Sequence, residues 1–483
     1  MDSASDFVLP LRNSGTADPS SGHCPSAHLV GICGAGMSAL ASILLDLGWT
    51  LTGSDLQVDE RLREVFRRRG VSVHQGHDSH HLPPQSRLLI HSAAIPADNP
   101  EREAARRRNI RELSYSQMIA ELMQSRVGIC IAGTHGKSTT AAMVAAILVE
   151  SGREPSACLG AEICSMGKSG WSGRGELFVV ESCEYRRSFL DFSPASAAIL
   201  GIEPDHFDCF ADFGETCEAF RQFAARVSPA GLLLARADCP GAIAASKAAP
   251  ARVETFSLLT DADWQASNVR TTADGNAFSV FYRGSCLNEF SLRLPGRHNV
   301  LNALAAIALC HHQGVSAAEI ASGLANFGGV RRRFEQKGTW RGVTLVDDYA
   351  HHPTEVRATL RAARDRFGRR RFWCVFQPHQ ISRTEALFGE FAGSFALADE
   401  VLLAPIYAAR EVADRRCVSL ARELARSIVA AGGRARFCAD LDRILATLDD
   451  EARPGDIVIT MGAGDIDRVH HEFTRRIQRY RAS

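Results

Sequence analysis

The sequence predicts an α/β protein of three domains, each a mostly parallel sheet with flanking helices. Its 483 residues are enough for about three domains. Short apolar segments of strand length alternate with helical segments, which is typical of parallel sheets covered on both faces. Hydrophobic residues make up 45% and charged residues 23% of the chain, an ordinary composition for a globular protein.

Charge and hydropathy exclude two classes of partner. Lys plus Arg and Asp plus Glu number 55 each, so no overall field favours nucleic acid and any anion site must be local. No apolar run approaches the ~20 residues that span a bilayer, so we expect no membrane partner.

The N-terminus and the cysteines predict a cytoplasmic location. Residues 1–27 are polar and rich in Ser, Gly and Pro, without the basic start and apolar stretch of a signal peptide, so we expect a disordered tail. The 14 cysteines include no Cys-x-x-Cys pair, and several lie inside apolar runs where reduced, buried thiols are expected.

The first domain is predicted at 28–124, with a Rossmann-like arrangement. We expect strands at 28–34, 50–55, 71–74 and 87–95, and helices at 36–47 and 59–69. Gly31, Gly34 and Gly36 follow the first strand, and Asp55 comes about 20 residues later, as in dinucleotide-binding turns. Their order differs from the dinucleotide spacing, so we interpret the turn as a nucleotide-diphosphate pocket. The alternative is a turn needed only for strand-to-helix packing.

The central domain, predicted at 125–328, opens with a phosphate loop. The apolar strand 129–132 ends in Gly-Thr-His-Gly-Lys-Ser at 133–138, and an alanine-rich helical run follows at 141–148. Free N–H groups at such a helix N-terminus hold phosphate oxygens, Lys137 can neutralise their charge and Ser138 can ligate Mg²⁺. The general pattern has Gly where this chain has Ile131. We still predict an ATP-binding P-loop domain.

Two later strands of this domain end in candidate metal ligands. We expect strands at 177–182 and 197–202, a β-rich passage at 264–294 and a helix at 299–312. Glu181 closes an apolar strand, and a carboxylate there suits Mg²⁺. His206 follows the next strand beside Asp205 and could ligate metal. The alternatives are an ordinary surface acid and a satisfied loop histidine.

The third domain is predicted at 329–483, again Rossmann-like. Its strands are expected at 343–347, 371–376, 400–407 and 456–461, with helices between them. The basic triplet 331–333 marks either a solvated face or a phosphate contact at the domain junction. Asp347, Asp348, His351 and His352 follow the first strand, as a metal site or as a loop that holds ribose and substrate. Chemistry alone does not separate these two readings.

The motifs and their order along the chain resemble those of the Mur ligase family, from about His28 to the C-terminus. No single motif is specific, but their combination is. The stretches that carry the resemblance are 30–38, 53–55, 92–95, 98–101, 133–138, 203–206, 296–303, 332–335, 347–355 and 462–465.

The resemblance implies an ATP- and Mg²⁺-dependent ligase of peptidoglycan precursor synthesis. The first domain would bind the UDP sugar, the second ATP and the third the amino acid. L-alanine would be joined to the lactyl carboxylate of UDP-N-acetylmuramate through an acyl phosphate, since a carboxylate is a poor electrophile. In-line transfer needs charge neutralisation more than an enzyme nucleophile. We expect a monomer or a weak homodimer.

The resemblance also implies roles for individual residues. The catalytic set would be Lys137, Glu181, His206, Arg333, His351 and His352. The metal ligands would be Ser138, Glu181 and His206. ATP would contact Gly133, Thr134, His135, Gly136, Lys137, Ser138, Thr139, Asn299, Arg333 and Asp348. The other substrates would contact Gly34, Gly36, Met37, Ser38, Ser54, Asp55, Ser92, Tyr349 and Arg383.

Four positions depart from the family pattern. Ser138 replaces a usual Thr and keeps the hydroxyl. Cys183 and Arg186 stand where acids are usual. Gln380 replaces an Arg that resembles a clamp for the amino-acid carboxylate, so we expect weaker binding or a different preferred amino acid. Residues 207–246 contain no Lys, so we expect no carbamylated lysine. The alternatives are a ligase that recycles murein peptides and a non-catalytic nucleotide-binding paralogue.

Overall fold

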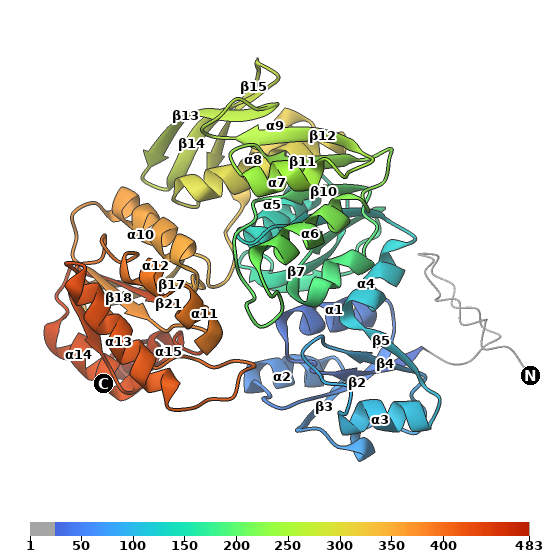
Figure 1. Ribbon diagram of the computed structural model, residues 1–483, viewed down its shortest axis with the longest axis horizontal. Coiled ribbons are helices and arrows are strands. Elements are labelled where there is room, and N and C mark those ends of the chain that lie inside the picture. Colours follow the sequence, from blue (N-terminus) through green and yellow to red (C-terminus); the bar gives the residue numbers. More distant parts are fainter. Residues whose placement is uncertain (1–24, 483) are drawn as a thin grey trace, which may run out of the picture.

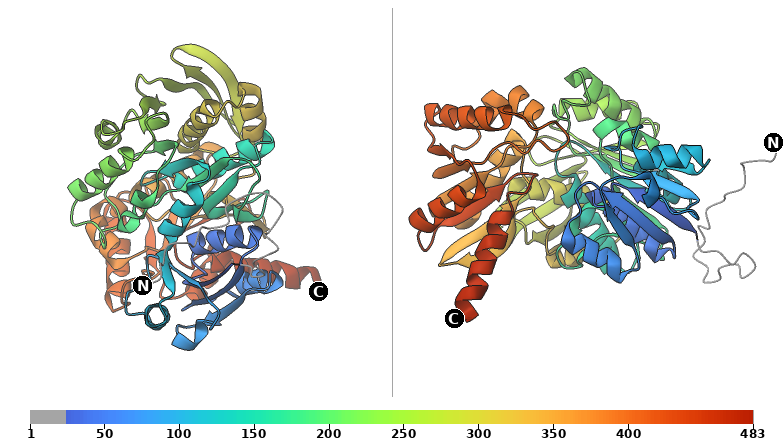
Figure 2. Two further views of the ribbon diagram at one scale, coloured as in Figure 1. Left: turned by 90° about the vertical axis from the view of Figure 1, so that its right-hand side faces the viewer. Right: turned by 90° about the horizontal axis from the view of Figure 1, so that it is seen from below.

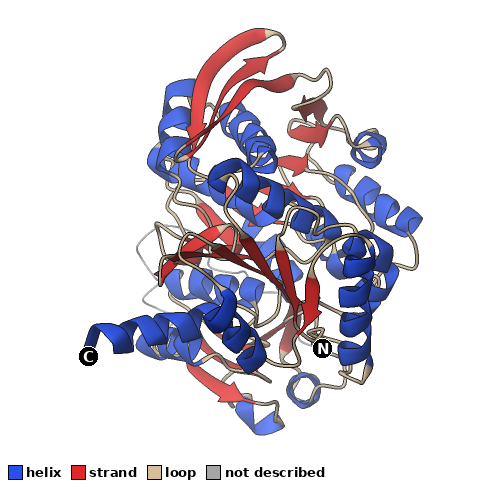
Figure 3. Cartoon of the chain, turned by 90° about the vertical axis from the view of Figure 1, so that its left-hand side faces the viewer, coloured by secondary structure: helices blue, strands red, loops and turns tan. Residues whose placement is uncertain are grey.

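The computed structural model describes residues 25–482, in which three sheets are each flanked by helices (Figure 1). The predicted three-part α/β fold is thereby confirmed. Most of the predicted tail, residues 1–24, lies outside the described residues. Helices cover both faces of the sheets (Figure 3). No helix of the described residues is both long and apolar enough to cross a membrane.

The N-terminal sheet has five parallel strands in the order β3-β2-β1-β4-β5. Its strands are β1 (Ser26–Val30), β2 (Thr50–Asp55), β3 (Ser72–Gln75), β4 (Leu88–His91) and β5 (Arg111–Ser114). Its helices are α1 (Ala35–Asp46), α2 (Glu60–Arg68), α3 (Pro100–Arg107) and α4 (Tyr115–Met123). From β1 the chain first adds strands toward one edge of the sheet and then, from β4 on, toward the other edge. Ligands of open α/β sheets bind at such a switch point, here between β1 and β4.

Two strands of this sheet are shorter than predicted. The strand expected at 28–34 ends at Val30, because the turn after it takes positive φ at Gly31 and leads directly into α1. The strand expected at 87–95 ends at His91. Asn99 then caps α3 by accepting hydrogen bonds from the N–H groups of Glu101 and Arg102.

The central sheet has ten strands in the order β15-β14-β13-β12-β11-β10-β6-β9-β7-β8. Its strands are β6 (Val127–Ala132), β7 (Ser156–Ile163), β8 (Lys168–Trp171), β9 (Leu177–Glu181), β10 (Ser196–Ile199), β11 (Leu232–Arg236), β12 (Arg252–Ser257), β13 (Trp264–Thr272), β14 (Gly275–Tyr282) and β15 (Ser285–Leu292). Its α-helices are α5 (Lys137–Glu150), α6 (Phe213–Ala224), α7 (Pro240–Ser246), α8 (Arg297–His312) and α9 (Ala317–Asn326). Strand β6 lies between β9 and β10, so the carboxyl ends of all three meet at one edge.

The C-terminal sheet has six strands in the order β16-β17-β21-β18-β19-β20, with only β16 antiparallel. Its strands are β16 (Glu335–Trp340), β17 (Val343–Asp348), β18 (Phe372–Phe376), β19 (Glu400–Leu403), β20 (Ala435–Phe437) and β21 (Ile457–Met461). Its helices are α10 (Pro353–Phe367), α11 (Ile381–Ala386), α12 (Phe388–Ala392), α13 (Arg416–Ala430), α14 (Leu441–Glu451) and α15 (Arg468–Ala482). The strand predicted at 400–407 ends at Leu403, and only an isolated bridge at Tyr407 continues it.

The first two sheets share one hydrophobic cluster, the central sheet has a second cluster of its own, and the third sheet has separate clusters. Helix α1 packs on β7 and β8 of the central sheet, so a single apolar cluster runs from Leu40 to Phe220. The C-terminal cores are separate clusters around Phe376 and Trp373. Seen from below, the orange and red C-terminal part stands apart from the blue and green parts (Figure 2).

Candidate active site

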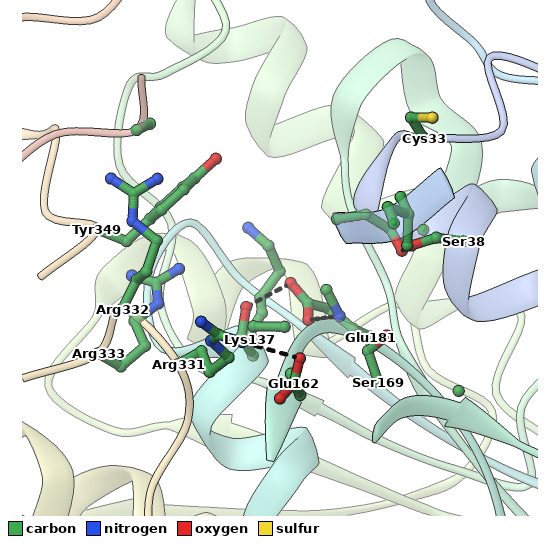
Figure 4. A pocket seen from close by; sticks show the side chains of 18 of the residues that line it. Cys33, Ser38, Lys137, Glu162, Ser169, Glu181, Arg331, Arg332, Arg333 and Tyr349 are labelled. Atoms are coloured by element: carbon green, nitrogen blue, oxygen red, sulfur yellow. Dashed lines mark hydrogen bonds and ion pairs between the residues drawn. The ribbon is translucent and has the colours of Figure 1, made fainter. Parts of the chain in front are cut away.

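A cavity of about 1190 Å³ opens where the three sheets meet. Gly36 and Ser38 line it from the N-terminal part, Lys137 and Glu181 from the centre, and Tyr349 from the C-terminal part (Figure 4). Residues far apart in the sequence therefore face a common space. Such a cavity at a junction of domains is the usual place for a ligand site.

The phosphate loop connects β6 to α5 and fits tightly against α8. Gly136 precedes the helix with φ of 81°, and a Cβ there would lie 2.4 Å from Asn302 Oδ1. Only glycine therefore suits the position. Lys137 and Ser138 begin α5 and line the cavity, so the N-terminus of this helix opens onto it. This cradle fits a triphosphate.

Lys137 forms a buried ion pair with Glu184. Its Nζ lies 2.9 Å from Glu184 Oε2 and also donates hydrogen bonds to the carbonyls of Gly133 and Thr134. Burial alone would lower the pKa of Lys137, but Glu184 and the other groups around the ammonium together outweigh burial and raise the pKa above the usual lysine value. The ammonium group is therefore charged. Glu184 was not predicted as a site residue, although a second acid just after β9 was a usable signal.

The three predicted metal ligands line the same cavity but fall into two groups. Ser138 Oγ donates to Glu181 Oε1 at 2.9 Å, and Gly160 N–H holds the other carboxylate oxygen at 2.6 Å. A hydroxyl and a carboxylate fit Mg²⁺, which prefers oxygen ligands. His206 lies instead beside Glu184, with Nε2 3.7 Å from Oε1. Burial lowers the pKa of His206, so its imidazole is neutral and able to bind a cation.

A smaller cavity of about 130 Å³ also borders the phosphate loop. Its lining brings together residues that were predicted to contact ATP: Gly136, His135, Thr139, Asn299, Arg333 and Asp348. Asp348 accepts hydrogen bonds from the N–H groups of Phe334 and Ala350, and burial raises its pKa to about 6. The guanidinium of Arg333 lies 5.0 Å from the centre of the Tyr349 ring. The central and C-terminal parts thus share this cavity.

His135 joins the phosphate loop to the C-terminal part. Its Nδ1 lies 3.1 Å from Glu355 Oε1, and its Nε2 lies 3.5 Å from Glu203 Oε2. Burial would lower the pKa of His135, but the two carboxylates raise it to about 9. The pKa of Glu203 falls to about 2, since these pairings outweigh the effect of burial. Both acids lie in motifs that carry the family resemblance, but no role was predicted for them.

The residues predicted near the amino acid are buried at the interface of the central and C-terminal parts. Arg383 is only 2% exposed and forms an ion pair with Asp205, with Nε 2.7 Å from Oδ1. Burial lowers the pKa values of both His351 and His352 to about 4, so both rings are neutral. Tyr349, His351 and Arg383 line the large cavity. His352 lines neither cavity and caps α10, with Nε2 3.3 Å from the Pro204 carbonyl.

The structure brings only some of the predicted N-terminal residues to the large cavity. Gly36 and Ser38 line it, while Gly34, Met37, Ser54, Asp55 and Ser92 do not. Met37 is packed in the core, and Ser54 is buried and donates to Glu101 Oε2. Asp55 accepts a hydrogen bond from the Cys33 N–H, which fixes the glycine turn.

Comparison with known proteins gives three matches that follow one another along the chain. Residues 26–127 match "Mur ligase family, catalytic domain", residues 131–310 match "Mur ligase middle domain", and residues 332–464 match "Mur ligase, glutamate ligase domain". The chain belongs to the Mur ligase family.

Its relatives within the family include enzymes of one named activity. The chain is 40% identical over 443 residues to the UDP-N-acetylmuramate–L-alanine ligase of Desulfitobacterium hafniense, covering 92% of this chain and 98% of that one. It is 38% identical over 465 residues to the ligase of the same name from Salinibacter ruber, covering 95% and 96%.

Solved structures of the family have the same architecture. A UDP-N-acetylmuramate–alanine ligase from Thermotoga maritima matches with a TM-score of 0.81 and 27% identity, covering 95% of this chain and all of that one. A murein peptide ligase from Psychrobacter arcticus matches with a TM-score of 0.73 and 26% identity, covering 93% and 98%.

Proposed function

We propose that this protein is an ATP- and Mg²⁺-dependent ligase that joins L-alanine to the lactyl carboxylate of UDP-N-acetylmuramate, in peptidoglycan precursor synthesis. The observation that carries the proposal is the lining of the large cavity. This lining combines a phosphate loop, a hydroxyl–carboxylate pair and a set of arginine and histidine side chains. The identity of 40% to a ligase of this activity over nearly the whole chain supports the same reaction.

ATP would bind across the two cavities. Asn299 and Asp348 would hold the nucleoside in the small cavity, and the N–H groups that begin α5 would hold the phosphates. Lys137 and Arg333 would neutralise phosphate charge. Ser138 and Glu181 would hold Mg²⁺, which supplies charge neutralisation for phosphoryl transfer.

The chemistry requires the acid to be activated before the amine attacks. The muramate carboxylate would take the terminal phosphoryl group of ATP to form an acyl phosphate, and the L-alanine amine would then displace phosphate. Water must be kept away from this acyl phosphate, and a site enclosed by three parts of the chain serves that purpose. Tyr349, His351 and Arg383 would face the amino acid, since they line the cavity from the C-terminal side.

The division of labour among the three parts belongs to the same proposal. The boundaries 28–124, 125–328 and 329–483 each enclose most of one sheet, which supports a UDP-sugar part, an ATP part and an amino-acid part. We further propose that the protein is a cytoplasmic monomer or weak homodimer.

One assay tests the proposal against its two alternatives. Purified protein is given ATP, Mg²⁺ and UDP-N-acetylmuramate, and phosphate release is measured with L-alanine, glycine, L-serine or a murein tripeptide. Release that depends on L-alanine supports the proposal. Release only with the tripeptide supports the recycling ligase. This alternative is retained because the murein peptide ligase of Psychrobacter arcticus has a similar structure. No release with any acceptor supports a non-catalytic paralogue.

A further inference from the structure

Cys183, Glu184 and His206 gather at the wall of the large cavity. One ligand atom from each of these residues lies within 4.8 Å of those from the other two. The first two residues follow β9 and His206 follows β10, so the strands on either side of β6 bring them together. Cys183 and His206 both line the cavity, which gives an ion a route of entry.

We propose that these three side chains bind a thiophilic divalent cation of the Zn²⁺ class, at a site separate from the oxygen pair of Ser138 and Glu181. Thiolate and imidazole are the ligands that Zn²⁺ prefers, whereas Mg²⁺ prefers oxygen. Three protein ligands leave a fourth position for water. On binding, the Cys183 thiol releases its proton to solvent and a sulfur–metal bond forms.

The geometry around His206 supports a ligand role. The ring presents Nε2 to the Glu184 carboxylate at 3.7 Å, beyond hydrogen-bond distance, which leaves Nε2 available to a cation. The backbone at His206 has φ of 54°, a strained conformation for a residue other than glycine. The ring packs at a tilt against Tyr185, with their centres 5.4 Å apart. The histidine is therefore held in place by its surroundings.

Occupancy of this site would act on the phosphate loop. Glu184 Oε2 is also the partner of Lys137 Nζ, at 2.9 Å. A divalent cation on the same carboxylate repels the ammonium group and competes for its partner. Zn²⁺ would therefore shift Lys137 away from Glu184, and we expect micromolar Zn²⁺ to change ATP affinity in the wild type more than in Cys183→Ser.

Cobalt provides the direct probe, since Co²⁺ substitutes for Zn²⁺ and absorbs in the near ultraviolet when a thiolate binds it. The full chain is titrated with Co²⁺ in excess Mg²⁺, without nucleotide or sugar. We expect a thiolate-to-cobalt band that Zn²⁺ removes and that Cys183→Ser lacks. Zn²⁺ affinity should fall at least about tenfold in this variant. Cys164→Ser is the matched control, because Cys164 is an exposed thiol of the same central part outside the cluster.

Two further variants keep the test decisive. Cys183→Asp retains a ligand but no sulfur, so it should lose the band even if Cys183→Ser folds poorly. His206→Gln should weaken Co²⁺ binding and shift the visible spectrum. An unchanged band in Cys183→Ser and Cys183→Asp, no band in the wild type, or a band that appears only when Mg²⁺ is left out would each overturn the proposal. The titration needs no turnover, so it fails or succeeds independently of the ligase assay.

Discussion

Lys137 is the residue whose charge most directly ties the phosphate loop to the chemistry. Its ammonium group is held by Glu184 and by two carbonyls of its own loop, and its pKa lies above the usual value. It is therefore a fixed positive charge at neutral pH. In the proposed reaction, a fixed charge beside the transferred phosphoryl group would need little reorganisation.

We predict that Lys137→Ala lowers the rate of phosphate release at least about 100-fold, because the charge that neutralises the phosphates is lost. Binding of UDP-N-acetylmuramate, measured by calorimetry, should change little. The UDP sugar is proposed to bind the N-terminal part, whose glycine turn before α1 follows a strand of a different sheet. Equal loss of sugar binding would contradict this division between the N-terminal and central parts.

The raised pKa of His135 predicts that the free energy of unfolding depends on pH. Its pKa is raised to about 9 in the folded chain by Glu203 and Glu355, against about 6.5 when unfolded. Its contribution is therefore fully present below pH ~6.5 and is lost as the pH rises through about 9. The upper limit is ~3 kcal/mol, and screening at the partly exposed Glu203 makes it smaller.

The measurement is thermal unfolding of the wild type and of His135→Asn between pH 6 and pH 9.5. We expect the wild type to lose stability relative to the variant across this range, so that the two curves converge at high pH. Curves that stay parallel would show that His135 is not charged in the folded protein.

At the scale of elements, the contact between α1 and β8 depends on Gly170. A Cβ at this position would lie 2.1 Å from the carbonyl oxygen of Ala39, in the middle of α1. Two backbones approach each other there, so the movement of a side chain cannot relieve a clash with an added Cβ.

We predict that Gly170→Ala destabilises the protein by ~1–3 kcal/mol, because α1 must move off the central sheet. Urea unfolding measures this change. Gly389→Ala is the control: a Cβ at this helical glycine meets no atom within 4 Å, so the change should be neutral or stabilising. Equal effects of both substitutions would disprove the close contact.

At the scale of the whole molecule, several polar pairs attach the C-terminal part to the central part. The N-terminal and central parts share one apolar core, whereas Asp205–Arg383, His135–Glu355 and Thr354–Glu203 pair the central and C-terminal parts. Such an attachment allows the C-terminal part to open and close over the cavity.

We predict that Asp205→Asn loosens this attachment, because it leaves the buried Arg383 guanidinium without its anion, at a cost of ~3–5 kcal/mol. Small-angle scattering should show a larger radius of gyration, and proteolysis should quicken at the junction near residue 330. Asp208→Asn is the control, since its partner Arg410 is partly exposed and their contact is 3.5 Å. An unchanged radius of gyration for Asp205→Asn would show that the Asp205–Arg383 ion pair does not hold the C-terminal part in place.

Local patterns sufficed for the general fold and for several residues that line the two cavities. The phosphate loop, Glu181 and the strand cores were predicted, because glycine turns, apolar strands and helix starts depend on neighbours in the sequence. Strand ends were less accurate: the strands expected to reach Gly34 and Tyr407 stop earlier, where turns and caps compete with pairing.

The partners of the site residues could not be predicted in the same way. Lys137 and Glu184 are 47 residues apart, Asp205 and Arg383 178, and His135 and Glu355 220. No periodicity links positions so distant. The same holds for Met37, which shares a motif with the cavity residues Gly36 and Ser38 but is packed in the core. It holds as well for Ser54, which is buried and donates to Glu101.

The sequence by itself determined that this is a three-part α/β protein with a phosphate loop, because backbone preference and hydrophobic period act over a few residues. It also determined the family, through the order of its motifs. Only the tertiary structure decided which charges meet: that Glu184 holds Lys137, that His135 carries a proton, and that Cys183 lies beside His206. Those facts depend on how three sheets pack together, and electrostatic energy depends on distance in space rather than along the chain.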